Sequence, residues 1–126
     1  MFTSLNNIII MTRGDSLEFK PTRHVLGRYN NYELKDGDAL YFGLMYPGQR
    51  FEDAIIRKMF TANEVNSLTD FVIELKPEDT VDLVPGKYFY ALKLQLNHEE
   101  YSPELGTVEV DKVITLINKT KFIIND

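Results

Sequence analysis

Residues 87–96 read Lys87-Tyr88-Phe89-Tyr90-Ala91-Leu92-Lys93-Leu94-Gln95-Leu96, and this stretch decides the fold. Large apolar residues occupy every second position from Tyr88 onward, while the positions between them are mixed or polar. Alternation with a period of two is typical of a β-strand that buries one face. We therefore expect residues 87–96 to form a long strand that places its tyrosines and leucines in the core.

Shorter segments of the same kind lie on both sides of this strand and are separated by turn residues. The predicted strands cover residues 8–13, 16–20, 39–46, 54–61, 71–76, 107–117 and 121–124. We expect the strand at 39–46 to be central, because it carries apolar groups on both faces.

Several segments between the strands have their own local signals. Pro77, Glu78 and Asp79 predict a short helical turn over residues 77–83, since proline and acidic residues are favoured in a first helical turn. The polar segments 21–38 and 97–106 are predicted to be loops. A bend, bulge or turn is expected at Asp111-Lys112, and a further turn at Asn118-Lys119.

This pattern predicts an all-β protein. Seven or eight short strands without a helical stripe favour an immunoglobulin-like antiparallel β-sandwich with one short helical turn. A small barrel is the alternative. The length of 126 residues fits one domain, so we expect residues 1–126 to form a single β-sandwich domain, with residues 1–7 allowed to be flexible.

Composition narrows the classes of function. The formal net charge of −5 disfavours binding to nucleic acid or to an anionic membrane surface. The chain has no cysteine, which excludes disulfides, thiolate nucleophiles and cysteine-type zinc sites. The apolar run Ile8–Met11 is too short for a signal core, and no segment reaches the roughly 20 apolar residues of a membrane span. We expect synthesis in the cytoplasm without Sec export.

Few residues suggest chemistry. His24 and His98 both lie in polar segments and are interpreted as solvated loop residues. His98-Glu99-Glu100 could contribute to a weak cation site, but solvated charge is the favoured interpretation. Asp36 and Asp38 flank Gly37 and predict a turn, because most ligand positions of a calcium loop are missing.

No nucleophile elbow or glycine-rich phosphate loop is present in the sequence. We therefore predict that the protein is not an enzyme and has no catalytic, cofactor-binding or metal-binding residues. A small hydrolase would need clustered carboxylates in a cleft, and it is the least favoured class of function.

Two short motifs and the aromatic content have structural interpretations. Arg13-Gly14-Asp15 matches an adhesion tripeptide, but its place between two strands favours a tight turn. Asn118-Lys119-Thr120 matches a glycosylation acceptor, which matters only in a secreted eukaryotic protein. Seven tyrosines and eight phenylalanines could form a sugar-binding row, although core and cross-strand packing is favoured.

Two parts of the chain resemble a known family. They are Ile10-Met11-Thr12-Arg13-Gly14-Asp15-Ser16-Leu17-Glu18-Phe19, and Leu75-Lys76-Pro77-Glu78-Asp79-Thr80 followed by Leu83-Val84-Pro85-Gly86-Lys87-Tyr88-Phe89-Tyr90-Ala91-Leu92-Lys93-Leu94. With the ending Thr120-Lys121-Phe122-Ile123-Ile124, they resemble the N-terminal domains of phage baseplate upper proteins and related short phage and prophage proteins. Residues 21–70 do not follow the family pattern in detail.

The resemblance implies an immunoglobulin-like sandwich that assembles in a phage tail or baseplate. It also implies a non-enzymatic virion protein that contacts other tail or baseplate proteins and forms homo-oligomers. The leading expectation is therefore a structural protein of the virion that acts through protein–protein contacts. The alternative is a carbohydrate-binding module of β-sandwich type with weak sugar affinity.

Overall fold

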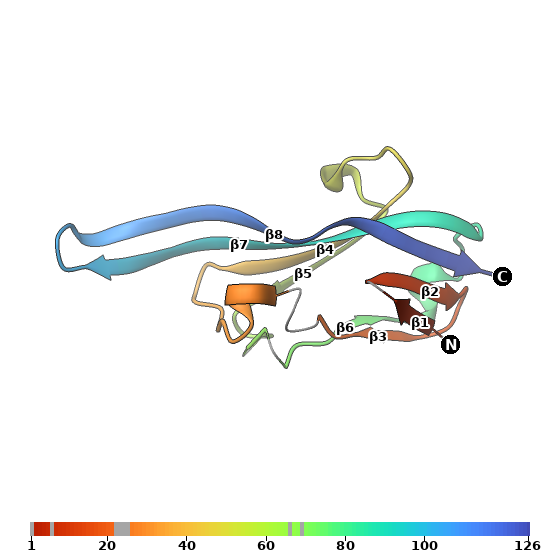
Figure 1. The fold of residues 1–126 in the computed structure, drawn as a ribbon, viewed down its shortest axis with the longest axis horizontal. Helices are drawn as coiled ribbons and strands as arrows, with labels where there is room; N and C mark the ends of the chain where they lie inside the picture. Colours follow the sequence, from red (N-terminus) through yellow and green to blue (C-terminus); the bar gives the residue numbers. More distant parts are fainter. Residues whose placement is uncertain (1, 6, 22–25, 66, 69) are drawn as a thin grey trace.

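The computed structural model of the chain describes residues 2–5, 7–21, 26–65, 67–68 and 70–126. A six-stranded sheet in the order β1-β2-β8-β7-β4-β5 faces a two-stranded sheet of β3 and β6 (Figure 1). The large sheet contains β1 (Phe2–Leu5), β2 (Ile8–Thr12), β4 (Ala39–Met45), β5 (Ile56–Thr61), β7 (Gly86–Ser102) and β8 (Gly106–Asn125). The small sheet contains β3 (Leu17–Phe19) and β6 (Ile73–Leu75).

The protein is mostly β with one short α-helix in the described part, as predicted. That helix is α2 (Pro77–Thr80), and two 3-10 turns are η1 (Gly27–Tyr29) and η2 (Phe51–Asp53). The large sheet is mixed, however, because β2 runs parallel to β8 and places Ile9 beside Phe122. The prediction of purely antiparallel pairing is therefore wrong. Side-chain alternation determines which face of a strand is buried, but not the direction of the neighbouring strand.

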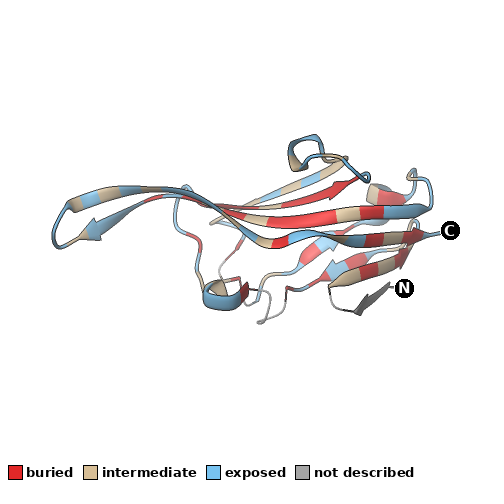
Figure 2. Cartoon of the chain, turned by 45° about the horizontal axis from the view of Figure 1, so that its top comes forward, coloured by how far each residue is buried: buried red, intermediate tan, exposed pale blue. Residues whose placement is uncertain are grey.

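Residues 87–96 lie in the long strand β7, as their alternation predicts. Five residues of β7 on one face are all buried: Tyr88, Tyr90, Leu92, Leu94 and Leu96. Strand β4 lies between β7 and β5, which confirms its central position. Figure 2 shows the buried positions alternating along these strands where they face the small sheet.

Tyr90 is at the centre of the core. Its ring lies 5.7 Å from Phe19 of the small sheet and 6.0 Å from Phe122 of β8, both in edge-to-face geometry. The Tyr90 hydroxyl donates a hydrogen bond to the main-chain carbonyl of Asn7, which satisfies its polar group inside the apolar environment. One residue therefore links β7, β8, the small sheet and the start of β2.

Residues 97–106 are not a loop. They belong to the long β7–β8 hairpin, in which Asn97 pairs with Asp111 and Ser102 pairs with Gly106. Their side chains lack a continuous apolar alternation, but antiparallel pairing satisfies the main-chain groups whatever the side chains are.

The predicted interruption at Asp111-Lys112 is wrong, because this pair continues the ladder in regular register. Asn118-Lys119 lies within β8 and is not a turn, but the first of two register shifts falls at this pair, opposite Ala91. The second shift follows between Leu92 and Lys93, and each shift leaves one extra residue on β8. Such bulges bend a strand and increase its twist without ending it.

The segment that runs from β6 through α2 to β7 connects the small sheet to the large sheet. Asp79 fixes the helix start, because its carboxylate accepts a 2.7 Å hydrogen bond from the main-chain N–H of Lys76. The same carboxylate accepts a 2.9 Å hydrogen bond from Nζ of Lys58 on β5. Burial alone would raise the Asp79 pKa, but these partners outweigh it and lower the pKa.

Candidate interaction arm and its buried root

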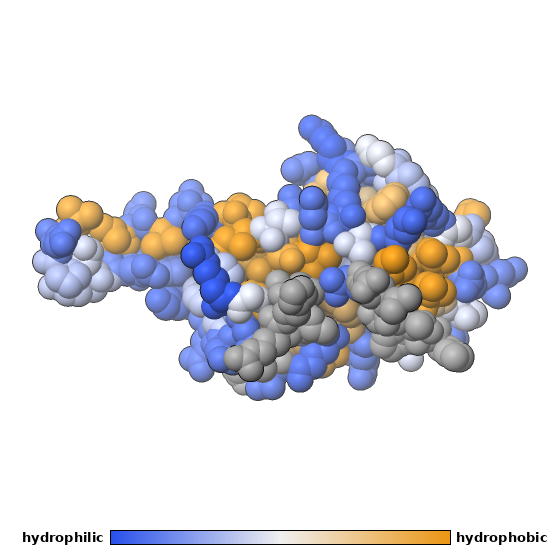
Figure 3. Space-filling view, in the orientation of Figure 1, coloured by the Kyte–Doolittle hydropathy of each residue, from blue (hydrophilic) through white to orange (hydrophobic). Residues whose placement is uncertain are grey.

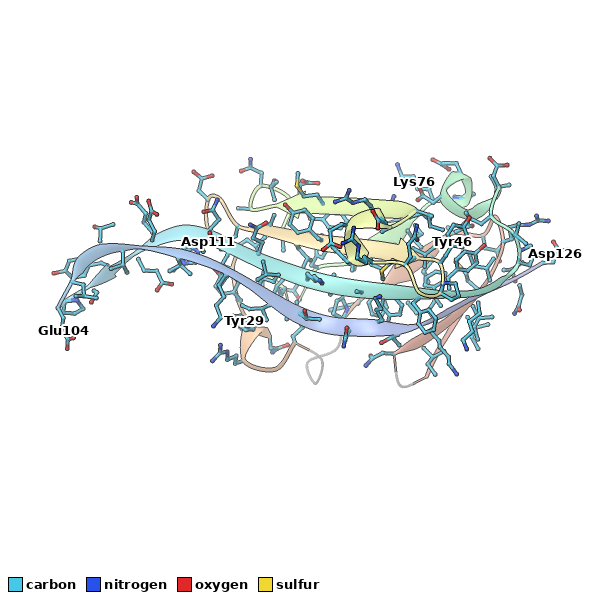
Figure 4. All side chains as sticks on the ribbon, turned by 90° about the horizontal axis from the view of Figure 1, so that it is seen from above. Tyr29, Tyr46, Lys76, Glu104, Asp111 and Asp126 are labelled. Carbon is cyan, nitrogen blue, oxygen red and sulfur yellow. The ribbon has the colours of Figure 1, made fainter. Side chains whose placement is uncertain are left out.

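The β7–β8 hairpin projects beyond the rest of the molecule. The last residue of β7 that pairs with β4 is Gln95, which faces Ala39. Beyond it only two strands continue, and we call residues 96–112 the arm. Figure 1 shows the arm extending away from the body, and Figure 4 places Glu104 at its tip and Asp126 at the opposite end of the molecule.

The arm tip carries apolar side chains in contact with solvent. Tyr101 and Leu105 are each 77% exposed. Hydrophobic atoms reach the end of the arm in the space-filling view of Figure 3. A two-stranded ribbon has no second layer beneath it, so these side chains have nothing to pack against within the chain.

The root of the arm contains a buried polar network centred on Asp38, the residue just before β4. The Asp38 side chain is 0% exposed, and its two oxygens accept four hydrogen bonds. Oδ1 accepts a 2.8 Å hydrogen bond from the Asn97 main-chain N–H and lies 2.7 Å from Nδ1 of His98. Oδ2 accepts from the Tyr32 hydroxyl and from the Lys35 main-chain N–H at 3.1 Å.

His98 joins this aspartate to a second carboxylate. Its side chain is only 3% exposed, and its Nε2 lies 2.8 Å from Oε1 of Glu100. Lys35 Nζ lies 3.5 Å from the same Glu100 oxygen. The network thus runs from the 32–38 segment to two successive inward-facing positions of the arm.

The contacts determine the protonation of His98. An ionised carboxylate only accepts hydrogen bonds, so both ring nitrogens must carry protons. The hydrogen bond to Glu100 and then the one to Asp38 raise the His98 pKa above 6.5, although burial opposes them. Hydrogen bonding to His98 lowers the Glu100 pKa. Burial would raise the Asp38 pKa, but the hydrogen bonds it accepts from Tyr32, His98 and two main-chain amides lower it.

The network of Asp38, His98 and Glu100, which we call the clamp, joins the base of the arm to the segment before β4. Both imidazole nitrogens face carboxylates, so neither is available to take a proton from a nucleophile as in a catalytic triad. Charge-assisted hydrogen bonds are among the stronger polar interactions in proteins. An isolated two-stranded hairpin is marginally stable in water. The network therefore holds the base of a ribbon that would otherwise be weakly stabilised.

The interpretation of His98 as a solvated loop residue is wrong. His98 follows Tyr88, Tyr90, Leu92, Leu94 and Leu96 at the same spacing of two, and this periodicity was the signal that could have placed it on the buried face. The other histidine, His24, lies outside the described residues.

The remaining acidic candidates have different surroundings. Lys35 to Asp38 forms the predicted turn, with a 2.9 Å hydrogen bond from the Asp38 N–H to the Lys35 carbonyl. Asp36 and Glu99 are exposed. The side chain of Asp38 is buried at the centre of the network, which the turn pattern did not predict. In the part of the chain that the structure describes, no three histidine, aspartate or glutamate side chains converge on a metal-sized site.

The adhesion-like tripeptide and the exposed tyrosines have structural surroundings that differ from those a binding site would need. Gly14 adopts a positive φ of 80° in a turn, and Arg13 donates a 2.6 Å hydrogen bond to the Asp126 carboxylate. The exposed tyrosines are Tyr46 and Tyr101, which lie near opposite ends of β7. They therefore do not form the row of rings that the carbohydrate-binding interpretation requires.

Comparisons with protein-family models, curated proteins and solved structures gave no match. Among the described residues, none of the helices has the length and apolar character needed to cross a membrane.

Proposed function

We propose that this chain is a non-enzymatic structural or assembly protein that acts through protein–protein contacts in a phage or prophage tail or baseplate. The observation that supports the proposal most directly is the projecting arm, with Tyr101 and Leu105 exposed at its tip. Covering exposed apolar groups of a projecting element with another protein surface removes them from water and is favourable. The partners in this proposal are other tail or baseplate proteins and further copies of the chain.

The tail setting comes from the sequence resemblance, and the fold is compatible with it. We propose that the two sheets are a variant of the immunoglobulin-like sandwich in which β3 and β6 form a reduced second layer. The resembling segments include the Gly14 turn, helix α2 and the central strand β7. The Gly14 turn and α2 connect the two layers, and β7 is a central strand of the large sheet, so the resemblance covers parts of the chain that define this architecture.

The test is to locate the chain in particles. Phage or tail particles would be purified from a strain that carries the gene, and the chain would be counted by quantitative mass spectrometry and placed by immunogold labelling. A fixed copy number on tails or baseplates is the expected result. A chain abundant in the soluble lysate but absent from purified particles would refute the proposed function.

A further inference from the structure

The outer face of the β7–β8 ribbon, which points away from the small sheet, has an uneven distribution of charge. Along the body this face carries Lys87, Lys93 and Lys121, and β5 adds Arg57 beside Gly43. Lys119 borders the same face, since its Nζ donates a 2.7 Å hydrogen bond to the main-chain carbonyl of Gln49. These cations, which we call the basic face, form no ion pair with any carboxylate among the described residues.

The sign of the charge reverses where the arm begins. On the same pleated face the arm presents Asp111, Glu99 and Glu109, all exposed, which we call the acidic face. Glu99 and Glu109 are direct cross-strand partners, an arrangement that is destabilising for like charges. Within the described chain no cation pairs with any of these three carboxylates.

An exposed apolar residue marks the boundary between the two faces. Val113 is 58% exposed and lies opposite Gln95, between the last lysine of the body and the first carboxylate of the arm. Its side chain borders a hollow on this face together with Phe51, Glu52 and Lys93. Protein interfaces commonly have an apolar centre with charged groups toward the rim, and Val113 has this position relative to the two faces.

The segment of residues 46–55 lies beside the outer face of the β7–β8 ribbon. Phe51 packs on Gly43 so closely that a Cβ there would lie 2.8 Å from the ring. Lys93 Nζ lies 4.6 Å from the centre of the Phe51 ring. This segment stands above β4 in Figure 1, and it reaches toward β7 and β8, where Phe51 contacts Lys93 and the Gln49 carbonyl accepts a hydrogen bond from Lys119.

We propose that this outer face is the interface of a two-fold symmetric dimer, in which the acidic face of each copy lies over the basic face of the other. The inference rests on the proposed function and specifies one of its partners, a second copy of this chain. A two-fold axis near Val113 makes the contact self-complementary: the valines of the two copies meet, and the unpaired charges of each face gain partners of opposite sign.

The size of this outer face is sufficient for such a contact. Fifteen residues of β7, from Lys87 to Tyr101, span roughly 50 Å at about 3.3 Å per residue. With a width of roughly 12 Å for two strands and their side chains, each copy would contribute on the order of 600 Å². Two copies would then bury about 1,200 Å² in total, at the lower end of specific protein interfaces.

Analytical ultracentrifugation of the complete chain, from 1 to about 200 μM, tests the proposal. We expect a reversible dimer in about 50 mM NaCl whose dissociation constant rises at least tenfold in about 300 mM NaCl, because the contacts are ionic. Val113→Asp would place two carboxylates at the symmetry axis and is expected to abolish the dimer. Val113→Thr keeps the shape without the charge and should change the dissociation constant less than threefold.

Charge reversal gives an independent test with a matched control. Glu99→Lys/Glu109→Lys should raise the dissociation constant at least tenfold. Glu18→Lys/Glu74→Lys changes another exposed cross-strand glutamate pair, in the small sheet, and should leave the dimer intact. Mixing the first variant with Lys93→Glu/Lys121→Glu should restore association as a heterodimer. Thermal unfolding of each variant would confirm that it is folded.

The outcomes separate this inference from the proposed function. A chain that stays monomeric throughout, or an oligomer that is unaffected by both Val113→Asp and the Glu99/Glu109 reversal, would overturn the two-fold interface. Detection of the chain on tails would still support the assembly role in either case. Absence from particles would refute the assembly role even if the purified chain dimerised.

Discussion

Replacing Asp38 with asparagine is expected to destabilise the protein by about 3 kcal/mol and to loosen the arm selectively. The substitution keeps the shape of the side chain but turns one of its two acceptor oxygens into an NH2 donor. In either orientation of the amide, the new NH2 group would face a main-chain N–H, that of Lys35 at the Oδ2 position or that of Asn97 at the Oδ1 position, and this donor would lose its acceptor. The His98 imidazolium would also lose one of its two counter-charges.

The magnitude follows from these two losses. An orphaned main-chain donor costs about 1–3 kcal/mol, and a hydrogen bond to a charged group contributes about 1.5–3 kcal/mol. A total near 3 kcal/mol allows for partial rearrangement. Unfolding entropy near 2.1 cal/mol/K per residue then predicts that the melting temperature of this 126-residue chain falls by about 11 °C.

Two measurements at pH 5.5, where His98 is charged, would check this prediction. Circular dichroism would give the melting temperature, and hydrogen exchange with mass spectrometry would report on residues 96–112. Asp79→Asn is the matched control, because Asp79 also accepts a main-chain hydrogen bond and an ion pair but lies away from the arm. It should cost about 1 kcal/mol and leave arm exchange unchanged. Melting of Asp38→Asn within about 3 °C of the parent, or unaltered arm exchange, would refute the clamp.

Three further expectations follow. The free energy of unfolding should be highest between about pH 4 and 6.5. The pKa of His98 is raised in the folded state, so its contribution is complete below 6.5 and is lost as the pH rises through the folded pKa, whereas the pKa of Asp38 is lowered, so its contribution is present above 3.8 and is lost as the pH falls. Unfolding free energies that increase from pH 6 to 9 would contradict this prediction. Gly37→Ala, with φ of 99° and a Cβ placed 2.0 Å from a carbonyl oxygen of β7, should cost more than about 2 kcal/mol and accelerate arm exchange. Gly48→Ala, at a φ of 81° in open space, should cost only about 1 kcal/mol and leave hydrogen exchange in the arm unchanged. Equal losses of stability for Gly37→Ala and Gly48→Ala in chemical denaturation would contradict close packing of Gly37 against β7. Tyr90→Phe should cost about 1 kcal/mol through loss of its hydrogen bond, with no change in the arm, and a neutral result would show that the bond is not needed.

Local sequence signals predicted the central strands well. The alternation in β7 identified its buried face, and the apolar groups on both faces of residues 39–46 identified β4 as a central strand. Pro77 and the following acidic residues correctly predicted a helical turn at α2. These features depend on interactions within a few residues, which a single sequence contains.

Pairing between distant segments could not be predicted in the same way. Ile9 and Phe122 are 113 positions apart, and nothing in either strand specifies a parallel neighbour. The polar network has the same origin: Asp38 and His98 each lie in an unremarkable polar context and become partners only when β4 is beside β7. The first strand of the arm was missed because polar His98 and Glu100 occupy the inward-facing positions at which the apolar alternation of β7 would have continued.

The parallel contact of β2 with β8 also affects the order of folding. Ile9 of β2 leaves the ribosome 113 residues before its partner Phe122. Until then β2 has only the short β1 beside it, and one of its edges remains open. Pairings over such long sequence separations slow folding and leave strand edges exposed to intermolecular association. We therefore expect the β2–β8 pairing to form late in folding, and the open edge of β2 to be exposed to association with other chains until it does.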